Sequence, residues 1–318
     1  MQVRCVSTGF ALPPRIETAA ELAPRIGRSA EWIVQRTGVA RRRIAECPVE
    51  VLAADAARAA LGDGPPPDLL INASVTPRQL LPDTSAFVLR ELGFSGIPGF
   101  SVHASCLSFV VGMHNAAALI QSGAYRRILV VSAERATAGR NVDEPESAAL
   151  LGDGAAAAVF EPHEGGSELE GWRMATFPAG VDFTSILGCG LYRHPNDAGT
   201  TPTDNLFHMN GLAVFKFAVR RAGVFVRRFL DDHGLTVDDI DLVVPHQASG
   251  PALEALSRFG FPADRVQNVI AETGNCVAAS LPLALAMADA DGRLTRGDRV
   301  LMLGTGAGLS VAGALWRW

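Results

Sequence analysis

Three residues of this sequence are of types that together can form and use an acyl thioester. Cys106 stands in "SVHASCLSFVVGMHNAAALIQSG", where a strand gives way to an apolar run typical of a helix. His246 follows the apolar stretch "LVVP", and Asn275 lies in "ETGNCVAAS". A cysteine thiolate is a nucleophile, and an imidazole or a carboxamide can donate hydrogen bonds to a reacting carbonyl. These residue types indicate an acyl group carried on cysteine and leave its acceptor open.

The position of Cys106 at the front of a helix favours that chemistry. Unpaired N–H groups at a helix N-terminus lower the pKa of a nearby thiol and can stabilise an oxyanion. His246 and Asn275 could donate to a second carbonyl and stabilise an enolate as carbon dioxide leaves, or His246 could act as a general base. Taken alone, the segment around Cys106 favours a buried core thiol, and Asn275 could be only a helix cap.

A long internal repeat predicts that the three residues meet. "PPDLLINASVT" at 66–76 resembles "DIDLVVPHQAS" at 239–249, and Gly-Phe pairs follow at 93–94 and 260–261. Two halves with one order of elements would bring the helix after Cys106 opposite the helix after Asn275. The strand that ends in "PHQAS" would deliver His246 to the same region. We therefore predict one catalytic site at the contact of the two halves.

The fold class expected from the sequence is α/β. In each half, short β-rich runs alternate with longer Ala- and Leu-rich segments, a pattern typical of mixed or parallel sheets covered by helices. The halves are predicted to span residues 1–165, with the nucleophilic cysteine, and 166–318, with the histidine and the asparagine. Residues 2–10 read as a first strand, and residues 162–210, rich in Gly, Pro and polar side chains, as crossover and surface elements.

The composition excludes several classes of protein. A net charge of −5 over 318 residues argues against a nucleic-acid-binding protein. No apolar stretch reaches the roughly 18 residues that cross a membrane, and the N-terminus lacks the pattern of a secretory signal. The five cysteines are scattered without C-x-x-C spacing, which argues against a disulfide framework and against a metal site. We expect a cytoplasmic protein.

The motifs around these residues resemble the thiolase superfamily, and most closely the β-ketoacyl-acyl carrier protein synthase III family. The resemblance covers essentially the whole chain, from "EWIVQRTGVARRRIA" through "LLGDGAAAAV" and "MNGLAVFKFAV" to "ETGNCVAASLPLAL" and "GTGAGLS". It implies a five-layer αβαβα fold and a homodimer. It also implies catalytic roles for Cys106, His246 and Asn275, with an oxyanion hole formed by the backbone N–H groups of Cys106 and Gly306.

The resemblance further implies the substrates. In that family the cysteine takes an acyl group from coenzyme A, and a malonyl thioester on acyl carrier protein then loses carbon dioxide and attacks it. No metal is implied, and no cofactor beyond the acyl-CoA or acyl-carrier-protein thioesters. Further residues match family positions, Trp32, Arg36, Asn210 and Gln247 as substrate-binding residues and Lys216 and Arg258 as carrier-protein docking residues.

Departures from the family pattern concern the substrate. Pro251 stands where the fatty-acid enzymes have an arginine, and "DEPESAALLGDG" lacks an arginine that stacks on adenine. "VHASCLSF" is more similar to relatives from specialised metabolism and hydrocarbon-forming condensation, although Leu81 replaces the glutamate of the latter branch. The leading hypothesis is a condensing enzyme of fatty-acid or polyketide biosynthesis. The alternatives are an acyltransferase that passes the acyl group to a hydroxyl or amine, and a non-catalytic partner subunit.

Overall fold

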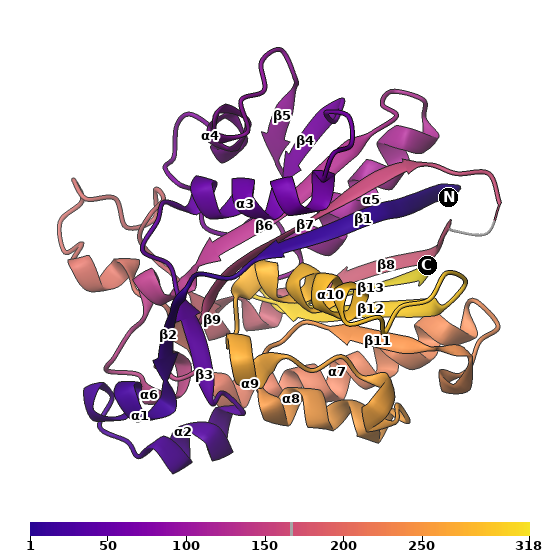
Figure 1. Cartoon of the computed structure of the whole chain (residues 1–318). Helices are drawn as coiled ribbons and strands as arrows, with labels where there is room; N and C mark the ends of the chain where they lie inside the picture. The colour runs from indigo at the N-terminus through magenta and orange to yellow at the C-terminus, as the bar shows by residue number, and fades with distance from the viewer. Residues whose placement is uncertain (166–167) are drawn as a thin grey trace.

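Two mixed β-sheets frame the molecule in the residues that the computed structural model describes, 1–165 and 168–318 (Figure 1). The first has the strand order β1-β7-β6-β4-β5, and the second has the order β11-β12-β13-β8. The larger strands are β1 (Val3–Ala11), β4 (Leu69–Asn72), β5 (Gly99–Ser101), β6 (Ile128–Arg135), β7 (Asp153–Pro162), β8 (Glu168–Thr176), β11 (Leu242–Pro245), β12 (Arg299–Gly306) and β13 (Ser310–Arg317).

Helices lie between the two sheets and on both outer faces. α5 and α10 separate the sheets, α3 and α4 cover the first sheet, and α7 covers the second (Figure 1). The predicted αβαβα layering is therefore confirmed. The α-helices are α1 (Ala19–Leu22), α2 (Ala30–Thr37), α3 (Val49–Leu61), α4 (Thr84–Glu91), α5 (Ser108–Gln121), α6 (Pro145–Ala148), α7 (Gly211–Asp231), α8 (Gly250–Glu254), α9 (Ile270–Thr273) and α10 (Ser280–Ala290).

Apolar packing explains why these layers are stable. The inner faces of both sheets enclose α5 and α10 in one cluster that includes the fully buried Leu107, Phe109 and Trp316. α3 packs its alanines on the outer face of the first sheet so closely that a side chain at Gly9 would strike the helix backbone. Burial of apolar surface at about 25 cal/mol per Å² supplies the main stabilisation.

The predicted repeat is visible in the strand pairing. In the first sheet, β4 runs parallel to β6, and β6 is antiparallel to β7. In the second sheet, β11 runs parallel to β12, and β12 is antiparallel to β13. In both sheets, the second strand of this series follows a central helix. Even the β4–β5 pair has a counterpart, a parallel bridge between Val243 and Val266. The predicted first strand at 2–10 is confirmed as β1.

The segment 162–210 contains more regular structure than predicted. β8 pairs with β13 at one end of the second sheet, as β1 pairs with β7 in the first. Its sequence "ELEGWRMAT" is polar and most of its residues are half-exposed or exposed, so an apolar pattern does not mark it. The predicted boundary between residues 165 and 166 falls at residues 166–167, which lie outside the described ranges, so the division into halves stays a prediction.

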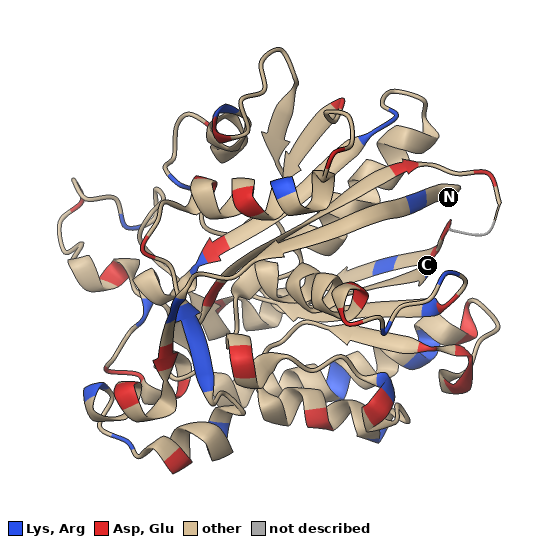
Figure 2. Ribbon diagram, in the orientation of Figure 1, with Lys and Arg blue, Asp and Glu red and all other residues tan. Residues whose placement is uncertain are grey.

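A smaller unit packs below the two sheets in Figure 1. Its hairpin joins β2 (Arg15–Thr18) to β3 (Arg41–Ile44), and α1 and α2 lie against it. Figure 2 shows β3 as a run of basic residues, whereas blue and red segments are scattered along the rest of the mostly tan ribbon. A second small antiparallel sheet pairs β9 (Thr184–Ser185) with β10 (His208–Met209). Within the described ranges, every helix is too short or too polar to cross a membrane.

Candidate active site

Cys106 lies in a tight turn two residues before α5. Ser105 adopts φ 52°, a left-handed conformation that costs a residue with a side chain about 1–3 kcal/mol. The Ser108 hydroxyl fastens the turn, because it donates to the Ser105 carbonyl (2.7 Å) and accepts from the Ala104 N–H (2.9 Å). The turn therefore holds the cysteine in a fixed orientation just ahead of the helix.

The surroundings of the Cys106 sulfur favour the neutral thiol. Burial, with a smaller contribution from the carboxyl of Glu134, raises the pKa of this thiol to about 11. The backbone N–H groups of Ala307 and of Cys106 itself donate toward the sulfur and lower the pKa, but burial outweighs them. The prediction of a thiol whose pKa is lowered by the helix N-terminus is therefore wrong, because desolvation is the larger effect.

The N–H groups that face the sulfur belong to Cys106 and Ala307, whereas the predicted oxyanion hole used those of Cys106 and Gly306. The family resemblance implied Gly306, which is the last residue of β12 and pairs with Ser310 across the β12–β13 hairpin. Ala307, the first residue of the following turn, is the one whose N–H reaches Cys106. A side chain built on Gly306 would instead contact Leu107, 3.2 Å from its Cγ. This contact favours Ala307 over Gly306 as the second N–H donor of the oxyanion hole, which stays a proposal.

His246 follows β11 and is 6% exposed. Its backbone N–H donates to the Leu303 carbonyl (2.8 Å), which fixes it beside β12. Burial lowers the pKa of the imidazole to about 4, so the ring is neutral at pH 7. Its Nδ1 has no hydrogen-bond partner within the described residues. Gly304 leaves room for the ring, because a side chain there would come within 3.2 Å of the His246 Cβ and 2.8 Å of Leu107 Cδ2.

Asn275 is held by backbone and side-chain hydrogen bonds. Its N–H donates to the Leu150 carbonyl (2.8 Å), and its side-chain Nδ2 donates to the Ala248 carbonyl (3.2 Å), two residues beyond His246. Its Oδ1 accepts from the Val277 N–H (2.8 Å), although Cys276 and not Asn275 is the N-cap residue of the short 3-10 helix Val277–Ala279. Because a carboxamide nitrogen carries two protons, one remains for a ligand.

These contacts bring the three predicted catalytic residues to the carboxyl end of β12. Cys106 touches the turn after that strand, His246 ends the neighbouring parallel strand, and Asn275 is bonded to the segment that follows His246. An apolar cavity of about 70 Å³ adjoins the imidazole, between α7 and the ends of β11 and β12. The site thus joins a thiol, two N–H donors, a neutral imidazole and a carboxamide, the groups needed for acyl transfer through cysteine.

The structure places the predicted substrate-binding residues in two different settings. Trp32 and Arg36 lie on α2, with Arg28 over the Trp32 ring and Arg36 bound to Glu146 through Nε and Nη2 (3.1 and 2.8 Å). Asn210 caps α7 by accepting from the Ala213 N–H (3.1 Å). An exposed arginine that is already paired with a carboxylate is a weaker site for a phosphate than a free one.

Gln247 has a structural setting, although the resemblance implied substrate binding. It is completely buried. Its amide donates to the carbonyls of Pro245 (2.9 Å) and Gln267 (3.0 Å) and accepts from the Val269 N–H (2.9 Å). The side chain has no exposed atom for a substrate, so we assign it to holding the loop that carries His246.

The predicted docking residues lie on the surface near one another in the fold. Lys216, which is the only lysine of the sequence, is exposed on α7. Arg258 is exposed on the short 3-10 helix Ala255–Phe259. The two elements line the same cavity beside His246.

One buried acid near the nucleophile was not singled out from the sequence. Glu134 is fully buried at the end of β6, and burial raises its pKa to about 7. Its carboxyl accepts from the backbone N–H groups of Val75 and Thr76. An acidic residue that ends the apolar run "ILVVSAE" is the signal that could have marked it.

Comparisons with known proteins all point to one enzyme family. Two family models match, the C-terminal part of 3-oxoacyl-[acyl-carrier-protein] synthase III over residues 230–318 and a second region of the same enzyme over residues 100–177. The chain is 36% identical to the β-ketoacyl-[acyl-carrier-protein] synthase III of Desulfitobacterium hafniense over 100% of this chain and 98% of that protein.

Two solved structures extend the likeness to the whole fold. The 3-oxoacyl-[acyl-carrier-protein] synthase III of Aquifex aeolicus superposes with a TM-score of 0.91 at 31% identity, over 99% of this chain and 100% of the other. The priming β-ketosynthase of the R1128 polyketide biosynthetic pathway superposes with a TM-score of 0.88 at 31% identity, over 99% and 96% of the chains. The similarity therefore spans both sheets and every element that carries the site.

Proposed function

The chain belongs to the 3-oxoacyl-[acyl-carrier-protein] synthase III family, and from that membership we propose how its residues divide the reaction. It is a β-ketoacyl-[acyl-carrier-protein] synthase III, an acyltransferase and condensing enzyme of fatty-acid or polyketide priming. Cys106 carries the acyl group, and His246 and Asn275 serve the condensation that follows. The single observation that carries this division is the pair of N–H groups, from Ala307 and Cys106, that face the sulfur.

The first half-reaction transfers the acyl group from a thioester donor to Cys106. The sulfur bonds to the donor's carbonyl carbon, the bond from that carbon to the donor sulfur breaks, and the thiol proton leaves with the departing thiol. The N–H groups of Ala307 and Cys106 stabilise the tetrahedral oxyanion. Because the thiol is protonated at pH 7, its proton must leave as the new bond forms, and the departing thiol of the donor is the group that takes it up.

The second half-reaction joins a two-carbon unit to the acyl group. A malonyl thioester loses carbon dioxide, and the enolate oxygen accepts hydrogen bonds from the His246 imidazole and the Asn275 Nδ2. The enolate carbon attacks the acyl carbonyl, the carbon–sulfur bond breaks, and the Cys106 thiolate regains a proton from solvent. A neutral imidazole suits this step, because its N–H can donate while the low dielectric of a buried site strengthens the bond.

We assign the partners from the family and from the surface. Acyl-CoA and acyl carrier protein are the thioester carriers, with Trp32 and Arg36 toward the first and Lys216 and Arg258 toward the second.

A homodimer is supported by β5, whose three residues are all exposed at the end of the first sheet, where an unpaired strand can bind another chain. Leu80 and Leu81, 70% and 80% exposed, lie on a neighbouring loop. We place the enzyme in the cytoplasm, where its cysteines would stay reduced.

A loading experiment tests the proposed nucleophile. The protein is incubated with a panel of acyl-CoA and acyl-carrier-protein thioesters, and its intact mass is recorded. We expect one acyl group per chain, mapped to Cys106 by peptide analysis and absent from Cys106→Ala. Loading of Cys106→Ala to the same extent would overturn the assignment. Release of the adduct by alcohols or amines, and not by malonyl thioesters, would favour the acyltransferase alternative.

A further inference from the structure

A buried arginine lies directly behind the segment that holds Asn275. Arg42, in the middle of β3, has no exposed surface. Its Nη1 donates to the carbonyl of Ala149 (2.7 Å) and lies 3.5 Å from the carbonyl of Leu151. Both carbonyls belong to "ALLGDG", the loop that leads into β7. Arg42 therefore fixes the backbone of this loop from one side.

Asn275 bonds to the same loop from the other side. Its N–H donates to the Leu150 carbonyl (2.8 Å), and its carbonyl accepts from the Gly152 N–H (3.0 Å). Leu151 and Asn275 form a parallel bridge. The residues 149–152 thus lie between the guanidinium of Arg42 and the backbone of Asn275. Any displacement of this loop would move Asn275 with it.

Close packing leaves the loop little freedom to move. A side chain on Gly152 would come within 2.0 Å of the Thr273 carbonyl oxygen. Gly274, with φ 66°, has the Leu150 carbonyl oxygen 2.8 Å from where its own side chain would stand. Both contacts are with backbone atoms, which cannot turn aside as a flexible side chain can. The loop and the segment 273–275 therefore move as one piece.

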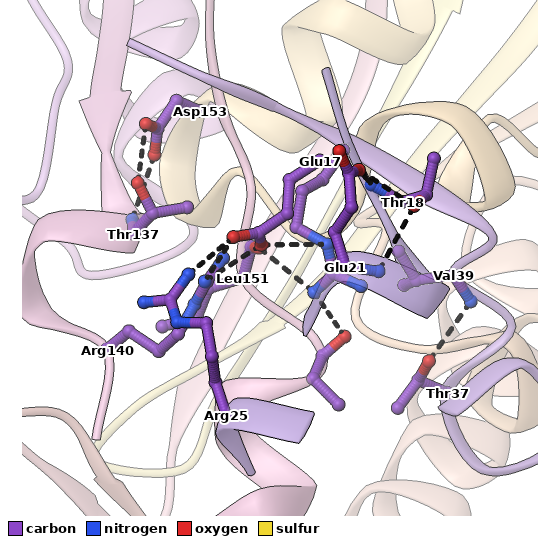
Figure 3. Close-up of polar contacts among 12 residues, drawn as sticks. Glu17, Thr18, Glu21, Arg25, Thr37, Val39, Thr137, Arg140, Leu151 and Asp153 are labelled. Carbon is purple, nitrogen blue, oxygen red and sulfur yellow. Dashed lines mark hydrogen bonds and ion pairs between the residues drawn. The ribbon is translucent and has the colours of Figure 1, made fainter. Parts of the chain in front are cut away.

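An ionic cluster centred on Glu17 orients Arg42. Glu17 is 5% exposed and lies close to Arg42 (3.8 Å), Arg140 (2.8 Å) and Arg25 (2.7 Å). Figure 3 shows the carboxylate of Glu17 between its basic neighbours, with Leu151 close by. Near the far end of the loop, Asp153 accepts from the Ala45 N–H (2.8 Å) and from Thr137, so β3 is tied to this segment at two points.

A buried ionic cluster of this kind contributes little net free energy to the stability of a fold. Nε and Nη2 of Arg42, and the same two atoms of Arg140, have no hydrogen-bond partner within the described residues. Buried ion pairs often contribute less to stability than apolar residues of the same volume, since desolvation of the charges opposes their attraction. The bonds that Arg42 does make are to the loop that is hydrogen-bonded to Asn275, which points to the geometry of the site as their use.

We propose that Arg42 is a positioning residue for Asn275, acting through the carbonyls of residues 149–151. This inference rests on the proposed role of Asn275 in condensation. Loss of the Arg42 bonds would let the loop shift and misplace the Asn275 carboxamide. A small misplacement of a catalytic donor can cost about 100-fold in rate. Acylation of Cys106 should be spared, because its N–H donors come from other elements.

Two substitutions and a control test the inference. Arg42→Met keeps much of the volume and leaves Glu17 with Arg140 and Arg25, whereas Arg42→Lys keeps the charge and one donor. Arg25→Gln removes another arginine of the same cluster, one that is half exposed and makes no bond to the loop. For each protein, single-turnover acylation of Cys106 and condensation of the preloaded acyl-enzyme with malonyl thioester are measured separately, after thermal unfolding has been checked.

We expect condensation by Arg42→Met to fall about 10- to 100-fold, with acylation within about twofold of the original protein. Arg42→Lys should recover part of the loss, and Arg25→Gln should change neither rate by more than about twofold. If Arg42→Met does not fold, the inference is tested by comparing Arg42→Lys, which should still lose part of the condensation rate, with Arg25→Gln, which should not. Equal losses in both half-reactions would overturn the inference, because they would indicate a purely structural role.

Combination with Asn275→Ala separates this inference from the proposed function. If Arg42 acts through Asn275, Arg42→Met should slow condensation no further in the Asn275→Ala background. Fully additive losses would overturn the inference while leaving Asn275 in its role. If Asn275→Ala by itself condenses at the original rate, the proposed role of Asn275 fails, and with it the positioning role of Arg42.

Discussion

The backbone N–H of Ala307 faces the sulfur of Cys106. Ala307 lies in the turn between β12 and β13 of the second sheet, whereas Cys106 comes from the first half of the chain. The surroundings of the proposed nucleophile are therefore built from both parts of the chain. The contact ties the oxyanion hole to the register of the β12–β13 hairpin. It also explains why a single residue in a turn, without any polar side chain, should matter for catalysis.

Removal of that N–H should slow the reaction strongly. Ala307→Pro lacks the donor, whereas Ala307→Gly keeps it and serves as the matched control. We expect kcat of Ala307→Pro to fall about 10²- to 10³-fold, the usual cost of one oxyanion donor. Ala307→Gly should stay within a few-fold. Steady-state kinetics of both variants, with circular dichroism to verify folding, make the comparison. Similar rates for the two variants would remove Ala307 from the oxyanion hole.

The reactivity of Cys106 should increase with pH far into the alkaline range. Burial raises the pKa of the thiol to about 11, so the thiolate fraction at pH 7 is on the order of 10⁻⁴. Alkylation of Cys106 by iodoacetamide should therefore accelerate about tenfold per pH unit between pH 7 and 10. Peptide mass spectrometry, with Cys106→Ala to identify the peptide, gives the rate at each pH. A plateau near pH 7 would contradict the buried neutral thiol.

His246 should remain neutral throughout the physiological range. Burial lowers the pKa of its imidazole from 6.5 to about 4, so condensation from a preloaded acyl-enzyme should lose rate only near pH 4 to 5. The unfolded chain binds a proton at this histidine below pH 6.5, whereas the folded chain does so only below pH 4. Stability is therefore full above pH 6.5 and declines as the pH falls toward 4, by roughly 3 kcal/mol at most. His246→Ala should lack this contribution in denaturant titrations at pH 7 and 4.5.

Release of Arg36 should strengthen binding of donors that carry a nucleotide. Glu146 holds the guanidinium in an exposed ion pair, an interaction worth about 0–1 kcal/mol. Glu146→Gln should therefore lower KM for an acyl-CoA up to about fivefold. KM for the corresponding acyl-pantetheine, which lacks the nucleotide, should stay unchanged and is the control. An equal change for both donors would show that Arg36 does not meet the nucleotide.

The sequence predicts which candidate residues lie together better than it predicts their environment. Cys106, His246 and Asn275 stand at the ends of recognisable strands and turns, and the repeat relates their positions, so pattern and spacing suffice to group them. The pKa of the thiol depends on how many atoms surround the sulfur, which no local pattern encodes. The contact with Ala307 depends on the exact register of two strands, and the neighbouring Gly306 is equally plausible in the sequence alone.

Long-range polar contacts are the other features that sequence reasoning missed. Arg42 belongs to the run Arg41–Arg43, which looks like an exposed basic face, yet only its middle member is buried. In a strand, successive side chains point to opposite faces, so the central arginine turns inward when its neighbours face solvent. Tertiary packing determines which carboxylate and which carbonyls the arginine meets. Although the loop at 149–151 overlaps the motif "LLGDGAAAAV", nothing in that motif or around Glu17 indicates a contact with Arg42.

Single-turnover analysis with labelled malonyl thioester tests the central claim most directly. Acyl-enzyme loaded at Cys106 is mixed with malonyl thioester that carries ¹³C in the free carboxylate, and carbon dioxide, β-ketoacyl product and remaining acyl-enzyme are quantified together. We predict one labelled carbon dioxide and one β-ketoacyl thioester for each acyl group lost from Cys106, with both products slowed together in Asn275→Ala. Loss of the acyl group without labelled carbon dioxide would contradict decarboxylative condensation at this site.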